Sequence, residues 1–265
     1  MHNSTPQFEE IRKRLLGIQE AETVRIFYAC ESGSRAWGFP SKNSDYDVRF
    51  LYIRERDWYL SIDVEHKRDV IELPIVDDFD INGWDLRKAL NLLRKSNPPL
   101  LEWLNSPIVY LEDEPMAAKF KSLVPKCYSP TACMYHYLHM ARGNFRNYLK
   151  GATVSVKKYF YVLRPILAIK WIEASTDVVP MEFGVLVENL LSNGELRDQI
   201  EKLIERKKLG DELKREPRIE VISNFIETEM ERLASKMVNY PVDKPSMEML
   251  NSVFREMTDQ SQTPN

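Results

Sequence analysis

Two short motifs, close together in the sequence, carry side chains that could bind a phosphate substrate and its metal: Gly33-Ser34 and Asp45-Tyr46-Asp47. Side chains alternate faces along a strand, so Asp45 and Asp47 would point the same way, about 6.6–7 Å apart. Neighbouring carboxylates repel each other unless a cation neutralises them, and Mg²⁺ combines such oxygen ligands with waters and phosphates. A Gly-Ser turn offers backbone N–H groups and a hydroxyl to phosphate oxygens. The pattern predicts a triphosphate–metal site; a loop with solvated acids is the alternative.

Strands are expected to hold both motifs in place. Val24–Cys30 is apolar and β-branched, which predicts a buried strand ending at the small-residue turn 31–38. The polar segment 39–44 reads as a loop, and the alternating segment Asp47–Ile53 as a second strand. The remaining elements predicted for this half are strands at 69–73 and 79–82, and helices at 9–22 and 85–95.

From about Pro115 onward, almost every segment has helical spacing, with helices expected at 116–123, 131–149, 155–174, 181–191, 195–208 and 218–237. The chain is therefore predicted to have an α+β fold, in which an N-terminal α/β core with a small mixed sheet precedes an all-helical C-terminal domain. The expected boundaries are 1–114 for the core, 115–257 for the helical domain and 258–265 for a disordered tail. A ligand is expected in the cleft between the two domains.

Composition excludes several classes of protein. With 265 residues, 43% of them hydrophobic and 29% charged, the chain is globular rather than disordered or fibrous. No apolar run is long enough for a membrane span, and residues 1–7 do not resemble a secretory signal. Three cysteines without metal-type spacing fit a reducing compartment. The expected location is the cytoplasm, with no membrane partner.

Charge is distributed unevenly along the chain. The net charge is −3, yet ten Lys and Arg residues and no Asp or Glu lie between Met116 and Trp171. A one-sided patch in an acidic protein favours a local anionic ligand, and a solvated helical face is the alternative. Aromatic residues are interleaved with these bases, which fits a single-stranded RNA, a nucleotide pocket or an aromatic core equally well. They are Tyr128, Tyr135, Tyr137, Phe145, Tyr148, Tyr159, Phe160 and Tyr161.

The segment CESGSRAWGFPSKNSDYDVRFLY, residues 30–52, resembles the nucleotide-binding signature of the DNA polymerase β-like nucleotidyltransferase superfamily. Residues 80–110 and KKYFYVLRP at 157–165 resemble its RNA-repair-pathway branch, the RlaP-type, YcgL-like predicted nucleotidyltransferases. Together these segments extend across most of the first 165 residues.

The resemblance implies a metal-dependent enzyme that transfers a nucleoside monophosphate from an NTP to a hydroxyl and releases pyrophosphate. It implies that Asp45 and Asp47 ligate two Mg²⁺ ions, with Mn²⁺ as a substitute, and that Asp80 is the third carboxylate, which helps to hold one ion and to orient or deprotonate the hydroxyl. Gly33 and Ser34 would hold the β- and γ-phosphates. Arg35 is a candidate phosphate contact or an exposed residue at a helix start.

An RNA 3′ end is the acceptor that the branch implies. The alternatives are a protein hydroxyl or a small molecule, or a non-catalytic module that binds nucleotide or RNA. The sequence does not identify the preferred NTP, the protein partners or the oligomeric state.

A second set of candidates has helical spacing. Lys158, Tyr161 and Arg164 lie at i, i+3 and i+6 on one helix face, and Pro165 is expected to kink that helix. In related nucleotidyltransferases a helix of this type faces the nucleotide, which implies phosphate contacts for the two cations and a sugar or base contact for Tyr161. An amphipathic helix with a core tyrosine is the alternative.

The other polar residues of the resembling segments are interpreted as structural. Asp85 is expected to complement the dipole of the helix that it opens, and Asn97-Pro98 to end a helix. Lys88 is interpreted in the same way, and Glu102 is expected to pair with a base. His136 and His139 lack a supporting ligand and are interpreted as core or cleft residues.

Overall fold

The computed structural model describes residues 5–210, 214–235, 240–241 and 245–260. Its N-terminal half contains a five-stranded mixed sheet in the order β3-β4-β2-β1-β5. The central strand β2 pairs antiparallel with β1 and parallel with β4, and the two edge strands are antiparallel to their neighbours. The strands are β1 (Arg25–Glu31), β2 (Tyr46–Ile53), β3 (Val70–Glu72), β4 (Phe79–Asp85) and β5 (Val109–Glu112).

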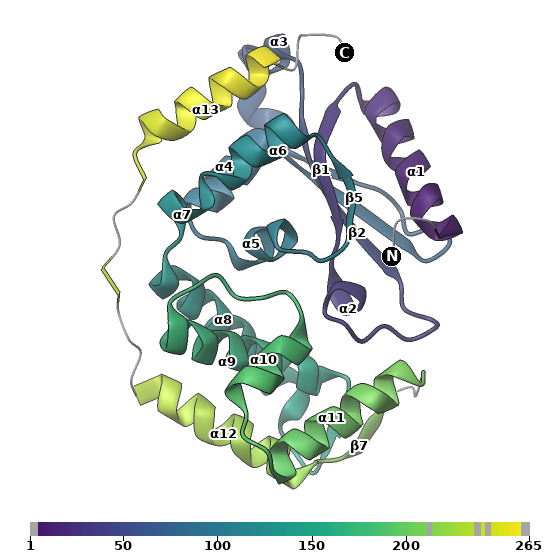
Figure 1. Cartoon of the computed structure of the whole chain (residues 1–265), viewed down its shortest axis with the longest axis vertical. Helices are drawn as coiled ribbons and strands as arrows, with labels where there is room; N and C mark the ends of the chain where they lie inside the picture. Colours follow the sequence, from purple (N-terminus) through teal and green to yellow (C-terminus); the bar gives the residue numbers. More distant parts are fainter. Residues whose placement is uncertain (1–4, 211–213, 236–239, 242–244, 261–265) are drawn as a thin grey trace.

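Helices cover both faces of this sheet (Figure 1). Helix α1 (Pro6–Glu22) covers one face, where its Ile11 and Leu15 belong to the same core cluster as Val48 and Phe50 of β2. The opposite face, to which Leu51 of β2 points, is covered by the apolar sides of α4 (Leu86–Arg94), α5 (Pro98–Leu104) and α6 (Glu114–Lys121). Because side chains alternate along a strand, the odd-numbered residues of β2 face away from α1.

The second half is helical, apart from a two-stranded ribbon of β6 (Thr153–Ser155) and β7 (Arg215–Pro217). Helices α8 and α9 form its centre, and α9 carries Pro165 within an otherwise continuous helix. Across the described residues, no helix combines the length and apolar character needed to cross a bilayer. The helices are α7 (Val124–Cys127), α8 (Pro130–Asn144), α9 (Lys158–Ser175), α10 (Phe183–Leu190), α11 (Glu195–Lys208), α12 (Glu220–Ser235) and α13 (Met247–Gln260), with a π-helical turn at Phe145–Leu149.

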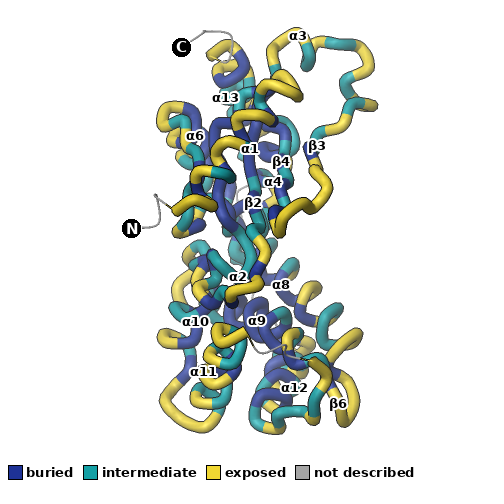
Figure 2. Tube along the Cα trace, turned by 90° about the vertical axis from the view of Figure 1, so that its right-hand side faces the viewer, coloured by how far each residue is buried: buried dark blue, intermediate teal, exposed yellow. Residues whose placement is uncertain are grey.

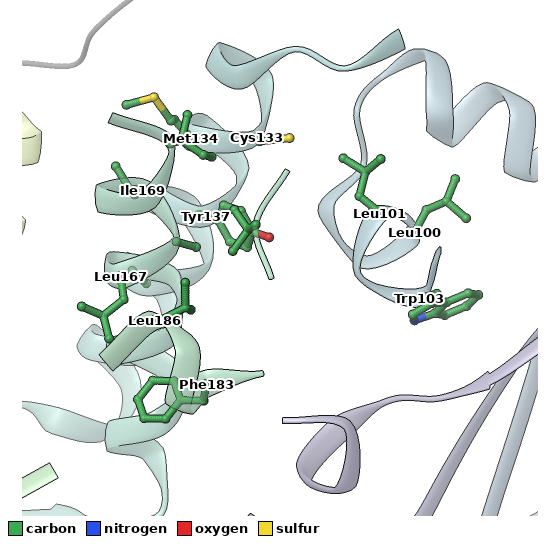
Figure 3. Packing of buried hydrophobic residues seen from close by; sticks show 14 of the residues in the cluster. Leu100, Leu101, Trp103, Cys133, Met134, Tyr137, Leu167, Ile169, Phe183 and Leu186 are labelled. Carbon is green, nitrogen blue, oxygen red and sulfur yellow. The ribbon is translucent and has the colours of Figure 1, made fainter. Parts of the chain in front are cut away.

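An apolar core is continuous between the two halves. Figure 3 shows the hydroxyl of Tyr137 pointing toward α5, on which Leu101 lies, whereas Trp103 of α5 points away from the helical half and stacks on Trp84 of β4. That hydroxyl donates a hydrogen bond to the carboxylate of Glu102 on α5 (2.7 Å). Figure 2 shows the two halves stacked, with the short helix α2 (Gly33–Ala36) where they meet.

The predicted fold class is confirmed, and three local features differ from the prediction. Asn97-Pro98 begins α5 rather than only ending α4, because the Asn97 side chain caps the helix and proline fits its first turn. Strand β5 was not predicted; it is a short edge strand. Residues 258–260 were predicted as tail but belong to α13, which returns to the sheet half, where Met257 and Thr258 are buried. Residues 261–265 lie outside the described part.

Candidate active site

The turn after β1 brings the Gly33-Ser34 motif directly against Asp47. Gly33 has a φ of +63°, and a Cβ built on it would lie 2.0 Å from the Oδ2 atom of Asp47. Only glycine accommodates both this backbone conformation and so close a carboxylate. The backbone N–H of Ser32 donates to the Asp47 carbonyl (2.8 Å), which joins the start of the turn to β2.

Parallel pairing of β2 with β4 places two of the three predicted aspartates side by side. Asp47 and Asp80 are direct partners in the register and lie on the sheet face opposite α1. Asp45 precedes β2 and is exposed. Asp45 and Asp47 line one cavity, whereas Asp80 is next to Asp47 but outside the lining.

Arg49 pairs with the two neighbouring carboxylates. Its Nη2 atom lies 2.8 Å from Asp80 Oδ2 and 3.3 Å from Asp47 Oδ1, and its Nη1 atom donates to the carbonyls of Val48 and Asp80. Burial raises the pKa of Asp47; the Arg49 cation lowers it, and the nearby charges of Asp80 and Asp45 raise it further. The carboxylates are thus crowded; Arg49 forms ion pairs with two of them, and the charge of Lys157 also lowers the pKa of Asp47.

These acids fit a divalent cation in their chemistry, because their hard oxygen atoms are crowded beside an open cavity. Across the described ranges, no three His, Cys, Asp or Glu side chains are close enough to form a metal site by themselves. Waters and substrate phosphates would have to complete the coordination, which is usual for Mg²⁺.

The cavity has a volume of about 190 Å³ and lies between the two halves. Acidic, basic and aromatic side chains meet there, as expected for a site that holds a metal, a phosphate chain and a base or sugar. Ser34, Asp45 and Asp47 come from the sheet half, and Phe160 and Tyr161 come from α9. Gly33, Trp37, Phe39, Asn43, Ser44, Lys157 and Lys207 complete the lining.

Two lysines in this cavity were missed by the sequence analysis. Lys157 directly precedes α9, and Lys207 in the last turn of α11 lies 3.2 Å from the Oγ atom of Ser41. Burial lowers the pKa of Lys207, and the nearby Lys157 lowers it further, whereas Asp45 raises it. Paired ammonium groups of this kind favour an anion. Lys157 could have been found as the neighbour of Lys158. Lys207 could not, because it is one of three consecutive bases at the end of α11, and such a run only indicates a match to the helix dipole.

The other predicted contacts lie around the cavity rather than in it. The Arg35 guanidinium donates to the carbonyls of Ser44 (2.7 Å) and Asp45 (3.2 Å), so Arg35 holds the loop that carries Asp45. The Lys158 ammonium lies over the rings of Tyr148 and Tyr161, at 4.7 and 4.2 Å from their centroids. Of the predicted helical trio, Tyr161 alone lines the cavity.

Arg164 lies behind the cavity wall and connects the two halves. Its side chain is 3% exposed and pairs with Glu102 at 2.5 Å. It also donates to the carbonyls of Pro180 and Met181, and its guanidinium lies over the ring of Trp37. Glu102 therefore pairs with a base as expected, across the boundary between the halves.

A fully buried glutamate supports the backbone at Asp47. Glu31 Oε1 accepts the Asp47 N–H (2.9 Å), and its other oxygen accepts the Tyr110 hydroxyl. Burial raises the pKa of Glu31 to about 7. Asp85, in contrast, caps α4 by accepting the Arg87 N–H (2.8 Å), as the sequence predicted. Lys88 pairs with Asp69 (3.0 Å).

Comparison with known proteins decides the family. The model of the RNA repair pathway DNA polymerase beta family, RlaP, matches residues 8–256. The chain belongs to this family. The uncharacterized protein YcgL of Bacillus subtilis (strain 168) is 52% identical over 239 residues, which cover 90% of this chain and 91% of YcgL. A nucleotidyltransferase-like protein from Exiguobacterium sibiricum 255-15, solved by crystallography, aligns with 94% of this chain and 87% of its own at 11% identity and a TM-score of 0.30.

Membership in the RNA repair pathway DNA polymerase beta family confirms the resemblance of residues 30–52, 80–110 and 157–165. It makes this chain a nucleotidyltransferase-like protein. The family match begins near the start of α1 and ends within α13, so it includes the sheet, the cavity and the helical half.

Proposed function

We propose that this chain transfers a nucleoside monophosphate from an NTP to a hydroxyl acceptor and releases pyrophosphate. The observation that carries the proposal is the cavity in which the Gly33-Ser34 turn, two aspartates and two lysines meet. A neutral ligand would not require crowded carboxylates beside paired ammonium groups. A nucleoside triphosphate with its divalent cation meets both requirements at once.

Each group of residues has a proposed task. The Ser34 hydroxyl and the backbone N–H groups of the turn bind the phosphate chain, and Lys157 and Lys207 neutralise it. Tyr161 packs against the sugar or base. Mg²⁺ or Mn²⁺, held by Asp45, Asp47 and Asp80, would supply charge stabilisation at the phosphates.

Asp80 has a second proposed task, which follows from its place beside Asp47 and outside the cavity lining. There it can accept the proton of an incoming hydroxyl while the NTP occupies the cavity. Arg49 holds the Asp80 carboxylate through a 2.8 Å contact and so orients it. We also propose that the catalytic domain ends near residue 114 and that the cavity lies between this domain and the helical domain.

An RNA 3′ end is the acceptor that we propose. The test incubates the protein with each α-³²P-labelled NTP, Mg²⁺ or Mn²⁺, and either total RNA or cell lysate. Label on RNA supports the proposal, whereas label on protein or on a small molecule moves the chemistry to another acceptor. NTP binding without labelling of any acceptor would favour a non-catalytic module.

Gly33→Ala is expected to lower transfer by about 10²-fold or more, because the added methyl group pushes the Asp47 carboxylate out of position. Gly38→Ala is the matched control: Gly38 also has positive φ (+91°), but a Cβ there meets nothing within 4 Å. Both variants should lose about 1–2 kcal/mol of stability from backbone strain. Equal transfer rates in the two variants would show that displacement of the Asp47 carboxylate is not the cause of the lost activity.

Lys157→Gln and Lys207→Gln are each expected to weaken NTP binding about 10- to 150-fold, the range for loss of a charged hydrogen bond. Isothermal titration with a non-hydrolysable NTP measures this effect. Lys208→Gln is the control, since Lys208 is exposed and lies outside this cavity. An unchanged affinity in both cavity variants would remove the lysines from the phosphate site.

A further inference from the structure

The structure separates the aromatic residues of the acid-free segment into core and surface. Tyr137, Tyr159 and Phe160 are buried and belong to the core. Tyr135 is 50% exposed and Tyr148 is 38% exposed. An aromatic core therefore explains only part of the pattern, and these two rings remain available on the surface.

Basic side chains accompany the two exposed rings. Tyr135, His139 and Arg142 follow one face of α8 at i, i+4 and i+7, and the helical path continues to Arg146 in the π-helical turn. All four are exposed, so His139 lies on the surface and not in the core or cleft where the sequence analysis placed it. We define the basic ridge as Tyr135, His139, Arg142, Arg146, Tyr148 and Lys150.

The cations of this ridge are not used in ion pairs within the described residues. Arg142, Arg146 and Lys150 have no carboxylate partner there, whereas most other arginines of the helical half do, such as Arg197 with Glu201 and Arg232 with Glu173. Their charge therefore remains available to a ligand. No Asp or Glu lies between Met116 and Trp171, so the ridge has no acidic neighbour along its own segment.

The ridge is connected to the proposed nucleotide cavity by direct contacts. Lys158 lies over the ring of Tyr148 on the ridge and over the ring of Tyr161, which lines the cavity. The π-helical turn, which contains Tyr148, ends the path that begins on α8; such turns occur frequently at functional sites. From residue 135 to residue 148 a helical path spans about 20 Å; Tyr148 lies about half a turn round the helix from Arg146, on the side of α9, so a chain that follows the ridge has to turn there toward the cavity.

We propose that the basic ridge binds the terminal nucleotides of a single-stranded RNA and directs its 3′ end toward the cavity. This inference rests on the proposed function, because it supplies the binding surface for the acceptor of that reaction. Cations neutralise phosphates, and exposed rings stack on unpaired bases without reading their sequence. Bases inside a duplex are already stacked and paired, so the ridge should prefer a single strand.

Binding of a fluorescein-labelled 12-nucleotide RNA to the full chain, measured by anisotropy without NTP or metal, tests the ridge. Arg142→Gln/Arg146→Gln is expected to weaken binding roughly tenfold or more. It should also lower the slope of log K against log salt by about 1.4, because each contact on a single strand contributes about 0.7. Tyr148→Leu is expected to weaken binding about 5- to 100-fold with the salt slope unchanged, as expected for loss of stacking.

Arg12→Gln/Lys13→Gln is the matched control: it removes the same charge from exposed positions on α1 and should leave RNA affinity within about twofold. Equal losses in both double variants would show a general charge effect and overturn the proposal. Duplex RNA bound as tightly as the single strand would overturn it as well. Single-stranded DNA of the same sequence shows whether the 2′-hydroxyl contributes.

The two proposals fail in different ways. If labelling of RNA depends on Asp47 but the ridge variants bind and label RNA like the unaltered chain, the proposed reaction is supported and RNA binding by the basic ridge is contradicted. If the ridge binds RNA as expected and no acceptor is labelled with any NTP, the ridge stands as an RNA-binding surface and the proposed reaction is wrong. Circular dichroism should show unchanged folding in every ridge variant, since the substituted side chains are exposed.

Discussion

Asp47→Asn is expected to lower nucleotide transfer by about 10³-fold or more without unfolding the chain. The carboxylate lies against Gly33, beside Asp80 and in the cavity wall. Loss of one group that stabilises transition-state charge costs roughly 10²–10³, and a weakened metal site adds to this. Initial rates with an α-³²P-labelled NTP and the acceptor found by labelling measure the effect.

The stability of this variant should not fall with its activity. Burial and the charges of Asp80 and Asp45 raise the pKa of Asp47, so the ionised form is held under electrostatic strain. A carboxyl with a raised pKa stabilises the fold less above that pKa than below it. A neutral amide should therefore leave the melting temperature at pH 7 unchanged or slightly higher.

Asp77→Asn is the control for this prediction. Asp77 is in an exposed turn, where it pairs with Arg14, and its side chain is 72% exposed. Its loss should change neither transfer nor folding by a measurable amount. If Asp47→Asn kept full activity, the metal site would be misplaced and the proposed chemistry would fail.

Arg164→Met is expected to destabilise the chain by about 3–5 kcal/mol, because it leaves the Glu102 carboxylate buried without its cation. The Arg164 side chain is 3% exposed and that of Glu102 is 14% exposed, so water cannot replace the lost partner. For a chain of this size, such a loss corresponds to a fall of roughly 6–20 °C in melting temperature. Urea unfolding measures the change in free energy.

A double-mutant cycle identifies the cause. Glu102→Leu/Arg164→Met removes both charges and should recover at least half of the lost stability, since an apolar replacement of a buried pair is often neutral. Arg197→Met is the control; it removes the Arg197–Glu201 pair on the surface of α11 and should cost less than about 1 kcal/mol. A large loss of NTP affinity with unchanged stability in Arg164→Met would instead support the phosphate contact that the spacing at 158, 161 and 164 implies.

Local patterns along the chain were sufficient for strands β1 to β4 of the sheet and for the helical second half, whereas Asp80 was identified as the third carboxylate from the family resemblance. Alternation in β2 and β4 determines which side chains share a face, and the Gly33-Ser34 turn must lie at the end of the strand before it. These features depend on neighbours in sequence or on one pairing between strands. These strands and helices could therefore be predicted before any tertiary contact was known, and the pairing of β2 with β4 then places Asp47 beside Asp80.

The helix spacing at 158, 161 and 164 shows where such patterns are insufficient. Three side chains on one helix face can point to a cavity, to a neighbouring ring or into the interface between the halves, and periodicity does not distinguish these places. Tyr161 reaches the cavity, Lys158 lies over two rings and Arg164 pairs with Glu102. The packing of α9 against α5 and α8 decides among them.

The sequence alone indicated the family and the fold class, and it placed Asp45 and Asp47 close to the Gly33-Ser34 turn, because these residues lie within one short strand–loop–strand segment. Only the tertiary structure revealed Lys207, which comes from a helix more than 150 positions away and lies near Ser41 and Asp45. It also separated exposed Tyr135 and Tyr148 from the buried tyrosines of the same segment. The exposure of these side chains and the charges around them depend on which elements pack beside each helix, and the local sequence pattern does not specify this.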